Sequence, residues 1–471
     1  MDESRANQIA TMWKMATASG VTVLPTRAAV GAMENLGVDM SNAAPLLREA
    51  EALHATQSWG RLAMVLAQVN AVIAAAIPCV RETEPATWGE YLTKTPAAIG
   101  SRSRSVVPGG VPGRARSGVS SGASTAVRSG VPVDYVDRVR GAWVGQCIGT
   151  ALGDPVEGWT SAEIAARHAP ISGYLAQPKV ENDDTAYPLL VLHTLDECGP
   201  AFTSTDLALE WVGHLPFAYT AEWAAIENMK AGIFPPESRW PRNPCGAWVG
   251  GQMRTTVHGL LAPLAPERAA ELAFRDAAIS HFREGMDGAI YAAALASLAF
   301  SGRSIEDLLR AALRFVPSEG AFAVTVERSL DACRRRGDWR PALDELRPEL
   351  DRYHWIHTIP NIACVVVGLV LGDGDFERAI LTTLQCGYDT DCTTGQVGAV
   401  MGGLLGSEAI PPRWSEPIGA ALKSYVEGFG EIGFDDLVAW TTRWGDRLGA
   451  EAARENLLRR DSKNHPTERA S

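Results

Sequence analysis

The sequence predicts an all-α protein in which a helical domain is preceded by a smaller helical domain. Apolar residues recur at helical spacing in one segment after another, and no run sustains the alternation that is typical of strands. The loops between these segments carry glycine and proline turns, as in residues 232–246 and 368–375. The chain of 471 residues exceeds the usual size of one hydrophobic core, so we expect two domains.

Residues 1–94 are expected to form the smaller, accessory domain. The segments 4–21 and 58–77 have helical spacing, and nothing in this region resembles a catalytic motif or identifies a binding partner. Residues 95–133 follow, dominated by Ser, Gly, Pro, Val and Arg and without an acidic residue. Such a composition cannot bury enough apolar surface to offset its ordering entropy. It predicts a flexible, weakly basic linker, and a solvated tether is favoured over a docking arm.

Residues 134–448 are expected to form the main helical domain, and residues 449–471 a fraying C-terminal tail. The clearest helical patterns lie in residues 134–152, 266–283, 304–316 and 375–386. Two helices carry glycine at nearly every fourth position, although each glycine weakens a helix by about 1 kcal/mol relative to alanine. We therefore expect a bare face on which another helix packs closely. The glycines are Gly141, Gly145, Gly149 and Gly153 on the first helix and Gly395, Gly398, Gly402 and Gly406 on the second.

Composition and charge argue against several classes of protein. The formal charge of -12 and the pI near 5.3 disfavour a nucleic-acid-binding surface, which needs a basic stripe. Eight cysteines are too sparse for a disulfide scaffold and the N-terminus lacks a signal-peptide pattern, so we expect a cytoplasmic protein. The apolar runs at 141–153 and 355–372 are short or interrupted by polar residues, so buried helices are expected rather than membrane spans.

Three acidic clusters mark the candidate site. They are GDPVEGW (residues 153–159), ENDDTAY (residues 181–187) and GYDTDC (residues 387–392). Carboxylates at the ends of such apolar helices are costly to bury unless a positive group pairs with them, so a bound cation is the natural partner. The second cluster alone also fits a plain helix start, since Asn and Asp cap helices.

The third cluster leaves two kinds of metal chemistry open. Cys386 and Cys392 suit a thiolate site for zinc or for redox work. Asp389 and Asp391 suit a site for a hard cation with oxygen ligands, in which the cysteines are bystanders. The matching aspartates in the second cluster favour the carboxylate interpretation.

The motifs RVRGAWVGQCIGTALGDPVEGW, ENDDTAYPLLVLHTL and GYDTDCTTGQVGAVMGGLLG, in this order and at these distances, resemble the ADP-ribosylglycohydrolase family. That family includes the enzyme that reactivates dinitrogenase reductase, and the resemblance covers about residues 134–440. Segments between the motifs look most like a bacterial branch of the family. The resemblance implies an all-α fold with a dinuclear Mg²⁺ or Mn²⁺ centre in a cleft, where the ions grip the ribose hydroxyls of ADP-ribose.

The resemblance also implies a set of site residues. The glutamate after the first helix, Glu157, would be catalytic, together with Asp184, which would also bind metal. Two positions depart from the family pattern: Asn182 and Cys392 stand where threonine is usual. An amide oxygen can still serve a hard cation, whereas a thiol is a poor ligand for Mg²⁺, so the second metal position is the weaker one. By motif position the metal ligands would be Asn182, Asp183, Asp184, Asp389, Asp391 and Cys392.

Three further residues are candidates for substrate contact. Trp159 has a ring that can stack on a base, although aromatic residues are more often core. His357 and Asn361 precede an apolar helix and either line the cleft or form a helix-start cluster.

The expected activity is metal-dependent hydrolysis of the N-glycosidic bond in an ADP-ribosyl or related N-ribosyl substrate, free or linked to a protein. One alternative is a non-catalytic ADP-ribose- or nucleotide-binding protein of the same fold, which also occurs in eye-lens crystallins. Another is a tailoring glycohydrolase that acts on a nucleotide-like metabolite.

Overall fold

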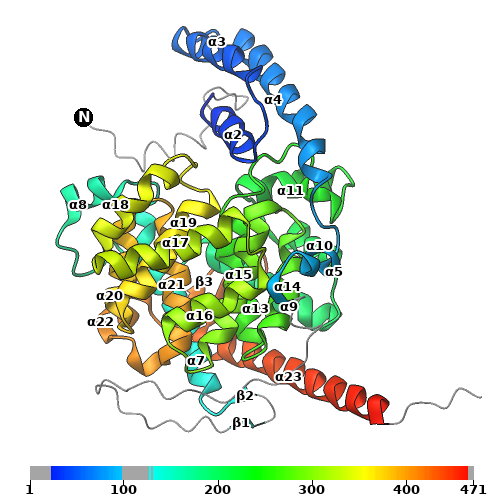
Figure 1. The fold of residues 1–471 in the computed structure, drawn as a ribbon, viewed down its shortest axis with the longest axis vertical. Helices are drawn as coiled ribbons and strands as arrows, with labels where there is room; N and C mark the ends of the chain where they lie inside the picture. The colour runs from blue at the N-terminus through cyan, green and yellow to red at the C-terminus, as the bar shows by residue number, and fades with distance from the viewer. Residues whose placement is uncertain (1–22, 98–126, 129–130, 465–471) are drawn as a thin grey trace, which may run out of the picture.

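The computed structural model describes residues 23–97, 127–128 and 131–464, and these residues are overwhelmingly helical (Figure 1). The predicted all-α fold is confirmed. Strands occur only as two short antiparallel pairs among the described residues: β1 (Val127–Arg128) with β2 (Val131–Pro132), and β3 (Ala421–Lys423) with β4 (Glu431–Gly433). The predicted helix at 4–21 lies outside the described residues, as does most of the predicted linker at 95–133.

The N-terminal helices project from one end of the main body (Figure 1). They are α2 (Val23–Asn35), α3 (Ala43–Ala55) and α4 (Trp59–Arg81). Their apolar core includes Met33 and Ile73 and extends to Trp240 and Phe282 of the main body. The next helix, α5 (Trp88–Thr93), lies on the main body itself, where the Tyr91 hydroxyl donates a 2.6 Å hydrogen bond to Asp287. The stretch 1–94, predicted as one accessory domain, therefore includes a segment that packs into the main core.

One helix, α4, contains a stretch with the length and composition of a membrane span. The expectation of no membrane span rests only on the apolar runs at 141–153 and 355–372. This stretch of α4, Trp59–Pro78, has a mean hydropathy of 1.7, and only 33% of it is buried. Most of its large apolar side chains, such as Leu66, Val69 and Ile73, are buried against the neighbouring helices, although Met64 is 67% exposed; the other exposed positions are mostly alanine, glutamine and asparagine. A helix surrounded by lipid would present its large apolar side chains outward. The side-chain distribution of α4 fits packing against protein.

Two glycine-rich helices form the centre of the main body. These are α7 (Tyr135–Gly153) and α21 (Thr390–Leu405), and they face each other along their glycine stripes. A Cβ atom added to Gly145 would lie 2.2 Å from the carbonyl oxygen of Gly398, and one added to Gly149 would lie 2.1 Å from that of Thr394. No side chain fits between backbones this close, which explains the glycines that the sequence predicted to lie at a close helix contact.

The remaining helices surround this pair. On the chain between the two central helices lie η1 (Asp154–Val156), α8 (Ser161–His168), α9 (Asp183–Cys198), α10 (Ser204–His214), α11 (Thr220–Lys230), η2 (Glu237–Arg239), α12 (Gly250–Arg254), α13 (Thr256–Leu261), α14 (Pro266–Ala277), α15 (Arg283–Ala299), α16 (Ile305–Ala312), η3 (Leu313–Phe315), α17 (Ala321–Arg336), α18 (Trp339–Leu350), α19 (Thr358–Gly372) and α20 (Phe376–Cys386). After α21 come η4 (Ser407–Ala409), α22 (Pro412–Ser415), η5 (Glu416–Ile418) and the β3–β4 hairpin.

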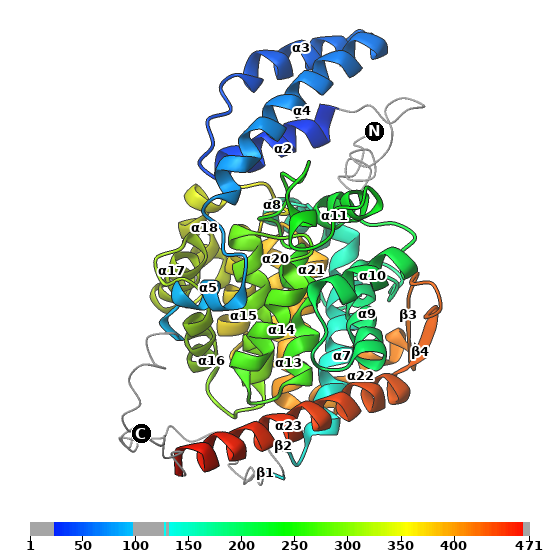
Figure 2. The same cartoon turned by 90° about the vertical axis from the view of Figure 1, so that its right-hand side faces the viewer.

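The last helix, α23 (Phe434–Asn464), runs across the end of the body opposite α2–α4 (Figure 2). The boundary predicted at Leu448 between domain and tail is not a helix end, because α23 continues through it. The residues that follow are rich in Ala, Glu, Arg and Leu, which are strong helix formers. Residues 465–471 of the predicted tail lie outside the described part of the chain.

Candidate metal centre

The packing of α7 against α21 determines where the acidic clusters meet. At the end of α7, a Cβ atom on Gly153 would lie 2.3 Å from the carbonyl oxygen of Thr390, in the first turn of α21. The Thr390 hydroxyl donates a 2.8 Å hydrogen bond to the Gly153 carbonyl. Because the two helices are antiparallel and in contact at this point, Glu157 lies beside the start of α21, although the two segments are more than 200 residues apart in the chain.

Two groups of potential metal ligands meet at this point and share Asp391. One contains Glu157, Asp389 and Asp391, and the other contains Asp184, Asp391 and Cys392. Within each group the potential ligand atoms lie within 4.8 Å of one another. The structure thus brings together five of the residues that the sequence predicts for the site.

Three of the aspartates lie buried at the starts of two helices. Asp389 is the N-cap of α21, Asp391 lies in its first turn, and Asp184 lies in the first turn of α9. Their exposed fractions are 3%, 5% and 1%. Asp183 precedes Asp184 on α9 but is only half-buried and belongs to neither ligand group.

The carboxylates lack the partners that buried anions need. In the part of the chain that the structure describes, one carboxylate oxygen each of Asp184, Asp389 and Asp391 is buried without a hydrogen-bond partner. Burial, and then the negative charge of Asp391, raise the pKa values of Asp184, Asp389 and Glu157 well above their usual range. The same two causes raise the pKa of Asp183 to about 7. Unpaired oxygens in a cluster of negative charge fit a hard divalent cation, which prefers oxygen ligands.

The Asn182 side chain bridges the two acidic helix starts. Its carbonyl oxygen accepts a 2.8 Å hydrogen bond from the backbone N–H of Asp184, so Asn182 caps α9. Its amide nitrogen donates to Asp391 over 3.1 Å. The helix-start interpretation therefore holds for this residue. As a metal ligand Asn182 stays a prediction, because in this arrangement its oxygen already serves the helix.

Cys392 lies inside the acidic centre, whereas Cys386 lies outside it. The Cys392 thiol donates to Asp184 Oδ2 over 3.7 Å, and its sulfur lies 3.6 Å from that of Met253. Burial and the surrounding carboxylates raise the pKa of this thiol well above its ordinary value, so the protonated form is favoured. Cys386 donates instead to the carbonyl of Thr382. Among the described residues no ligand group joins the two cysteines, so the geometry favours oxygen chemistry over a thiolate site.

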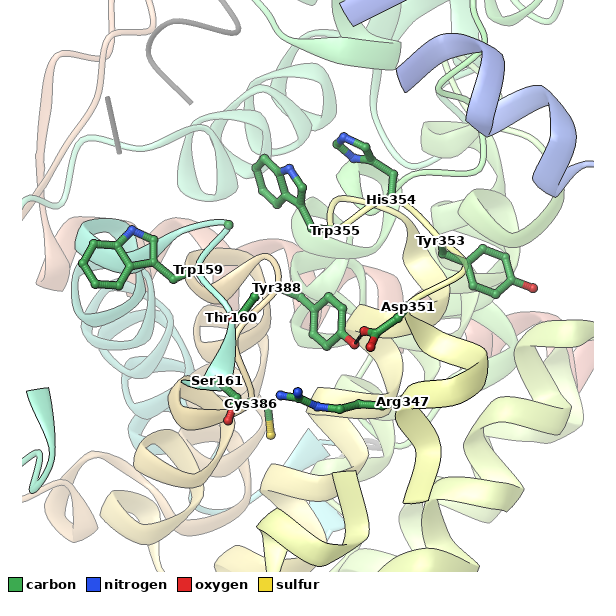
Figure 3. Close-up of a pocket in the computed structure, with 11 residues that line it drawn as sticks. Trp159, Thr160, Ser161, Arg347, Asp351, Tyr353, His354, Trp355, Cys386 and Tyr388 are labelled. Atoms are coloured by element: carbon green, nitrogen blue, oxygen red, sulfur yellow. Dashed lines mark hydrogen bonds between the residues drawn. The ribbon is translucent and has the colours of Figure 1, made fainter. Parts of the chain in front are cut away.

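A cavity of about 350 Å³ lies next to the segments that carry Glu157 and Asp389, and none of its lining residues belongs to the two ligand groups (Figure 3). Gly158 and Tyr388, which are the chain neighbours of Glu157 and Asp389, line it and are joined by a 2.8 Å backbone hydrogen bond. The Tyr388 hydroxyl points to Asp351 over 2.5 Å. The other lining residues are Trp159, Thr160, Ser161, Arg347, Tyr353, His354, Trp355 and Cys386.

The three residues predicted to contact substrate have different surroundings. Trp159 lines the cavity but is only 6% exposed, and the guanidinium of Arg167 lies 4.9 Å from its ring centre. His357 is the N-cap of α19, and its Nδ1 accepts from the Ile359 N–H over 3.2 Å. Its Nε2 is buried without a hydrogen-bond partner among the described residues, and burial lowers the pKa of the ring to about 3.

Asn361 is fully buried and connects the His357 segment to the acidic centre. Its amide nitrogen donates to the carbonyls of Trp355 and His357, and its oxygen accepts from the Asp389 N–H over 3.1 Å. With both amide hydrogens used by the backbone, Asn361 is a positioning residue for the start of α21.

Two tyrosines belong to the surroundings of the centre, although no motif singles them out in the sequence. Burial and the charge of Asp183 both raise the pKa of Tyr219, and the same two effects raise that of Tyr425. Tyr425 follows β3 and packs against Phe217, with 4.3 Å between ring centres and the rings tilted by 33°. Asp154 also lies near enough for Asp391 to raise its pKa, after the larger effect of burial. Asp154 belongs to the motif GDPVEGW, which could have signalled it.

Comparison with known proteins relates the main body to one protein family. A family model described as ADP-ribosylglycohydrolase matches residues 132–446. A protein of Escherichia coli (strain K12), printed as "Uncharacterized protein YegU", is 23% identical over 332 residues, which are 64% of this chain and 94% of that protein. A solved structure titled "ADP-ribosylglycohydrolase-related protein complex" aligns with a TM-score of 0.48 and 21% identity, over 67% of this chain and 99% of that one.

Proposed function

The chain belongs to the ADP-ribosylglycohydrolase family, and from this premise we propose that it is a metal-dependent hydrolase that cleaves the N-glycosidic bond of an ADP-ribosyl or related N-ribosyl substrate. One observation carries the proposal: the buried and unpaired oxygens of Asp184, Asp389 and Asp391 converge beside Glu157. Such a cluster has no structural use in a helical bundle, because it destabilises the metal-free fold.

The acidic residues are the ligands we propose for one or two Mg²⁺ or Mn²⁺ ions. Asp391, which both ligand groups share, would be common to two positions, with Asp389 on one side and Asp184 and Cys392 on the other. Glu157 lies beside the first of these positions and is not counted as a ligand. A bound divalent ion supplies Lewis-acid polarisation of oxygen and lowers the pKa of a bound water. Cys392 is the weak member of the set, since its protonated thiol is a poor ligand for such ions.

Glu157 is the proposed general acid or base. Cleavage of a ribosyl bond builds positive charge at the anomeric carbon and needs a water that loses a proton. Burial and the charge of Asp391 raise the pKa of Glu157, which favours the protonated form from which a general acid donates. Asp184 shares its burial and raised pKa, and would orient the reacting groups from the opposite helix start.

The cavity beside Glu157 supports a nucleotide-like substrate. Its lining combines the indoles of Trp159 and Trp355 with the cationic side chain of Arg347. Aromatic faces stack on bases, and guanidinium groups bind phosphates through parallel hydrogen bonds. The substrate would be a small molecule or a protein-linked ADP-ribosyl group, and a cytoplasmic location stays a prediction.

A hydrolysis panel tests the proposal. The wild-type chain and the Glu157→Gln variant are assayed on ADP-ribosyl-arginine, ADP-ribosyl-serine, NAD and simple N-ribosides, with and without Mn²⁺. We expect Mn²⁺-dependent turnover of at least one substrate, and a loss of about 10²–10⁴-fold in Glu157→Gln, the usual value of a general acid or base. Mn²⁺ affinity should change little in this variant.

Two outcomes would contradict the proposal. Equal turnover by Glu157→Gln and the wild type excludes the role of this glutamate. Tight Mn²⁺ binding without turnover of any substrate in the panel favours the alternative, a binding protein of the same fold.

A further inference from the structure

A third group of potential ligands lies towards the C-terminal half of α9, away from Asp184. It consists of His193 on α9 and Glu210 and His214 on α10, with ligand atoms within 4.8 Å of one another. His193 lies nine positions after Asp184, which corresponds to about 14 Å along an α-helix. This cluster is therefore separate from the acidic centre.

Both imidazoles point at the same carboxylate oxygen. His193 Nδ1 lies 2.5 Å and His214 Nε2 lies 3.3 Å from Glu210 Oε2. The other ring nitrogen of His214, Nδ1, lies 2.8 Å from the carbonyl oxygen of Glu427. A carbonyl only accepts hydrogen bonds, so Nδ1 carries the proton and neutral His214 presents the Nε2 lone pair to the carboxylate. Two acceptors that face each other need a proton or a cation between them.

The outer partner of His214 matches that of a metal-bound imidazole. A histidine ligand usually donates its second ring N–H to a carbonyl or a carboxylate, which fixes the orientation of the ring. His214 has the Glu427 carbonyl in this position, whereas Glu197 lies 3.9 Å from His193 Nε2, too far for a direct hydrogen bond. The side chains of His193, Glu210 and His214 are 24%, 16% and 29% exposed, which leaves an entry path and room for a water ligand.

We propose that His193, Glu210 and His214 form a second metal site, which binds a borderline-soft divalent ion of the Zn²⁺ class. Two imidazoles and one carboxylate suit Zn²⁺, whereas the oxygen-rich acidic centre suits harder ions. The side chains come from two helices, so the bound ion would join α9 to α10.

The site also holds the loop between β3 and β4, which lies on the same side of the body as α9 and α10 (Figure 2). The Glu427 N–H donates a 2.9 Å hydrogen bond to the His214 carbonyl, and the ring of Phe429 lies 5.1 Å from that of His193. The same loop carries Tyr425, which packs against Phe217 and lies near enough to the acidic centre for Asp183 to raise its pKa, after the larger effect of burial. An ion at His193 and His214 would therefore fix the loop that places Tyr425.

Zinc titration of the full chain without a histidine tag tests the site. Calorimetry with Zn²⁺ is performed in the Asp391→Asn background, which removes the ligand shared by both groups of the acidic centre. We expect one equivalent of Zn²⁺ to bind. His193→Gln and His214→Gln should each weaken this binding by at least about 100-fold, the upper end of the loss caused by removing an outer partner alone. His54→Gln, which changes an exposed histidine on α3, is the matched control and should bind as before.

A second measurement keeps the test independent of the folding of these variants. X-ray absorption of the zinc-loaded Asp391→Asn protein should report two imidazole ligands. A spectrum without imidazole scattering, or Zn²⁺ affinity that is equal in His54→Gln, His193→Gln and His214→Gln, would overturn the proposal. Neither result bears on turnover by the acidic centre, so the two proposals fail separately.

Discussion

Replacing Gly398 by alanine places a methyl group where the two central helices touch. The added Cβ would lie 2.0 Å from the carbonyl oxygen of Gly145 and 2.7 Å from its carbonyl carbon. Both neighbours are backbone atoms of α7, so no side chain can rotate away. The two helices must move apart by more than an ångström to restore an ordinary contact.

The size of the effect follows from two opposing contributions. Overpacking of a well-packed core costs about 1–3 kcal/mol, and separation of the helices also loses contacts along their length. Alanine returns about 1 kcal/mol through its better helix propensity. We expect the free energy of unfolding to fall by about 2 kcal/mol. Because Glu157 follows the end of α7 by four residues and Asp391 lies in the first turn of α21 beside it, Mn²⁺ affinity should fall as well.

Gly403 on the same helix provides a matched control. A Cβ atom at this position would meet the Cβ atoms of Ala142 and Ala299 at 3.7 and 3.8 Å, which are ordinary contacts. Gly403→Ala should therefore leave stability unchanged or raise it by up to about 1 kcal/mol. Urea unfolding followed by circular dichroism, together with Mn²⁺ titration, measures both variants. If Gly398→Ala is as stable as Gly403→Ala, the backbone contact does not determine the packing of this helix pair.

Two further predictions concern single side chains. Cys392→Thr should bind Mn²⁺ about tenfold more tightly, because a hydroxyl replaces a poor ligand. Calorimetry measures the Mn²⁺ affinity, and an unchanged affinity would mean that the side chain at position 392 does not face the ion. Burial raises the pKa of Asp287 to about 8, against about 3.9 in the unfolded chain. The contribution of the protonated Asp287 carboxyl to stability is therefore complete below about pH 4 and is lost as the pH rises through 8. Asp287→Asn stays neutral and keeps an acceptor for the Tyr91 hydroxyl, so its advantage in melting temperature over the wild type should grow between about pH 4 and pH 8. An advantage that does not change with pH would refute the assignment.

The sequence predicts the helical class because helical periodicity is local, and it predicts the close helix contact because glycine is costly in a helix without a packing reason. The eight glycines do not reveal that the two stripes face each other, because the pairing of two helices is determined by the tertiary structure. The mutual register of Gly153 and Thr390, which brings Glu157 to Asp391, is visible only in the structure.

The residues of the candidate site can be predicted where several ligands lie close together in the sequence. The residues that contact those ligands from distant parts of the chain cannot be predicted in this way. Asp184, Asp389 and Asp391 belong to short acidic motifs and can be recognised in one dimension. Asn361 acts through a hydrogen bond to a residue 28 positions away, and Tyr425 approaches from a hairpin near the end of the main body. Neither has a local signal.

The apolar stretch of α4 shows a different limit. Its composition satisfies the criterion for a membrane span, yet most of its large side chains, Met64 excepted, are buried on one face against other helices. A helix with one buried and one exposed face is hard to recognise from the sequence when the exposed face is rich in alanine, because alanine counts as apolar in a hydropathy average.

Mn²⁺ binding to the wild type and to Asp391→Asn tests the central claim most directly. Asp391 belongs to both ligand groups, so a change from carboxylate to amide removes a charged ligand from each while retaining the size of the side chain. Electron paramagnetic resonance distinguishes free from bound Mn²⁺ without reference to a substrate. We expect bound Mn²⁺ in the wild type and its loss in Asp391→Asn, with the fold of the variant retained by circular dichroism. Equal binding by the two proteins would contradict the assignment of the metal centre.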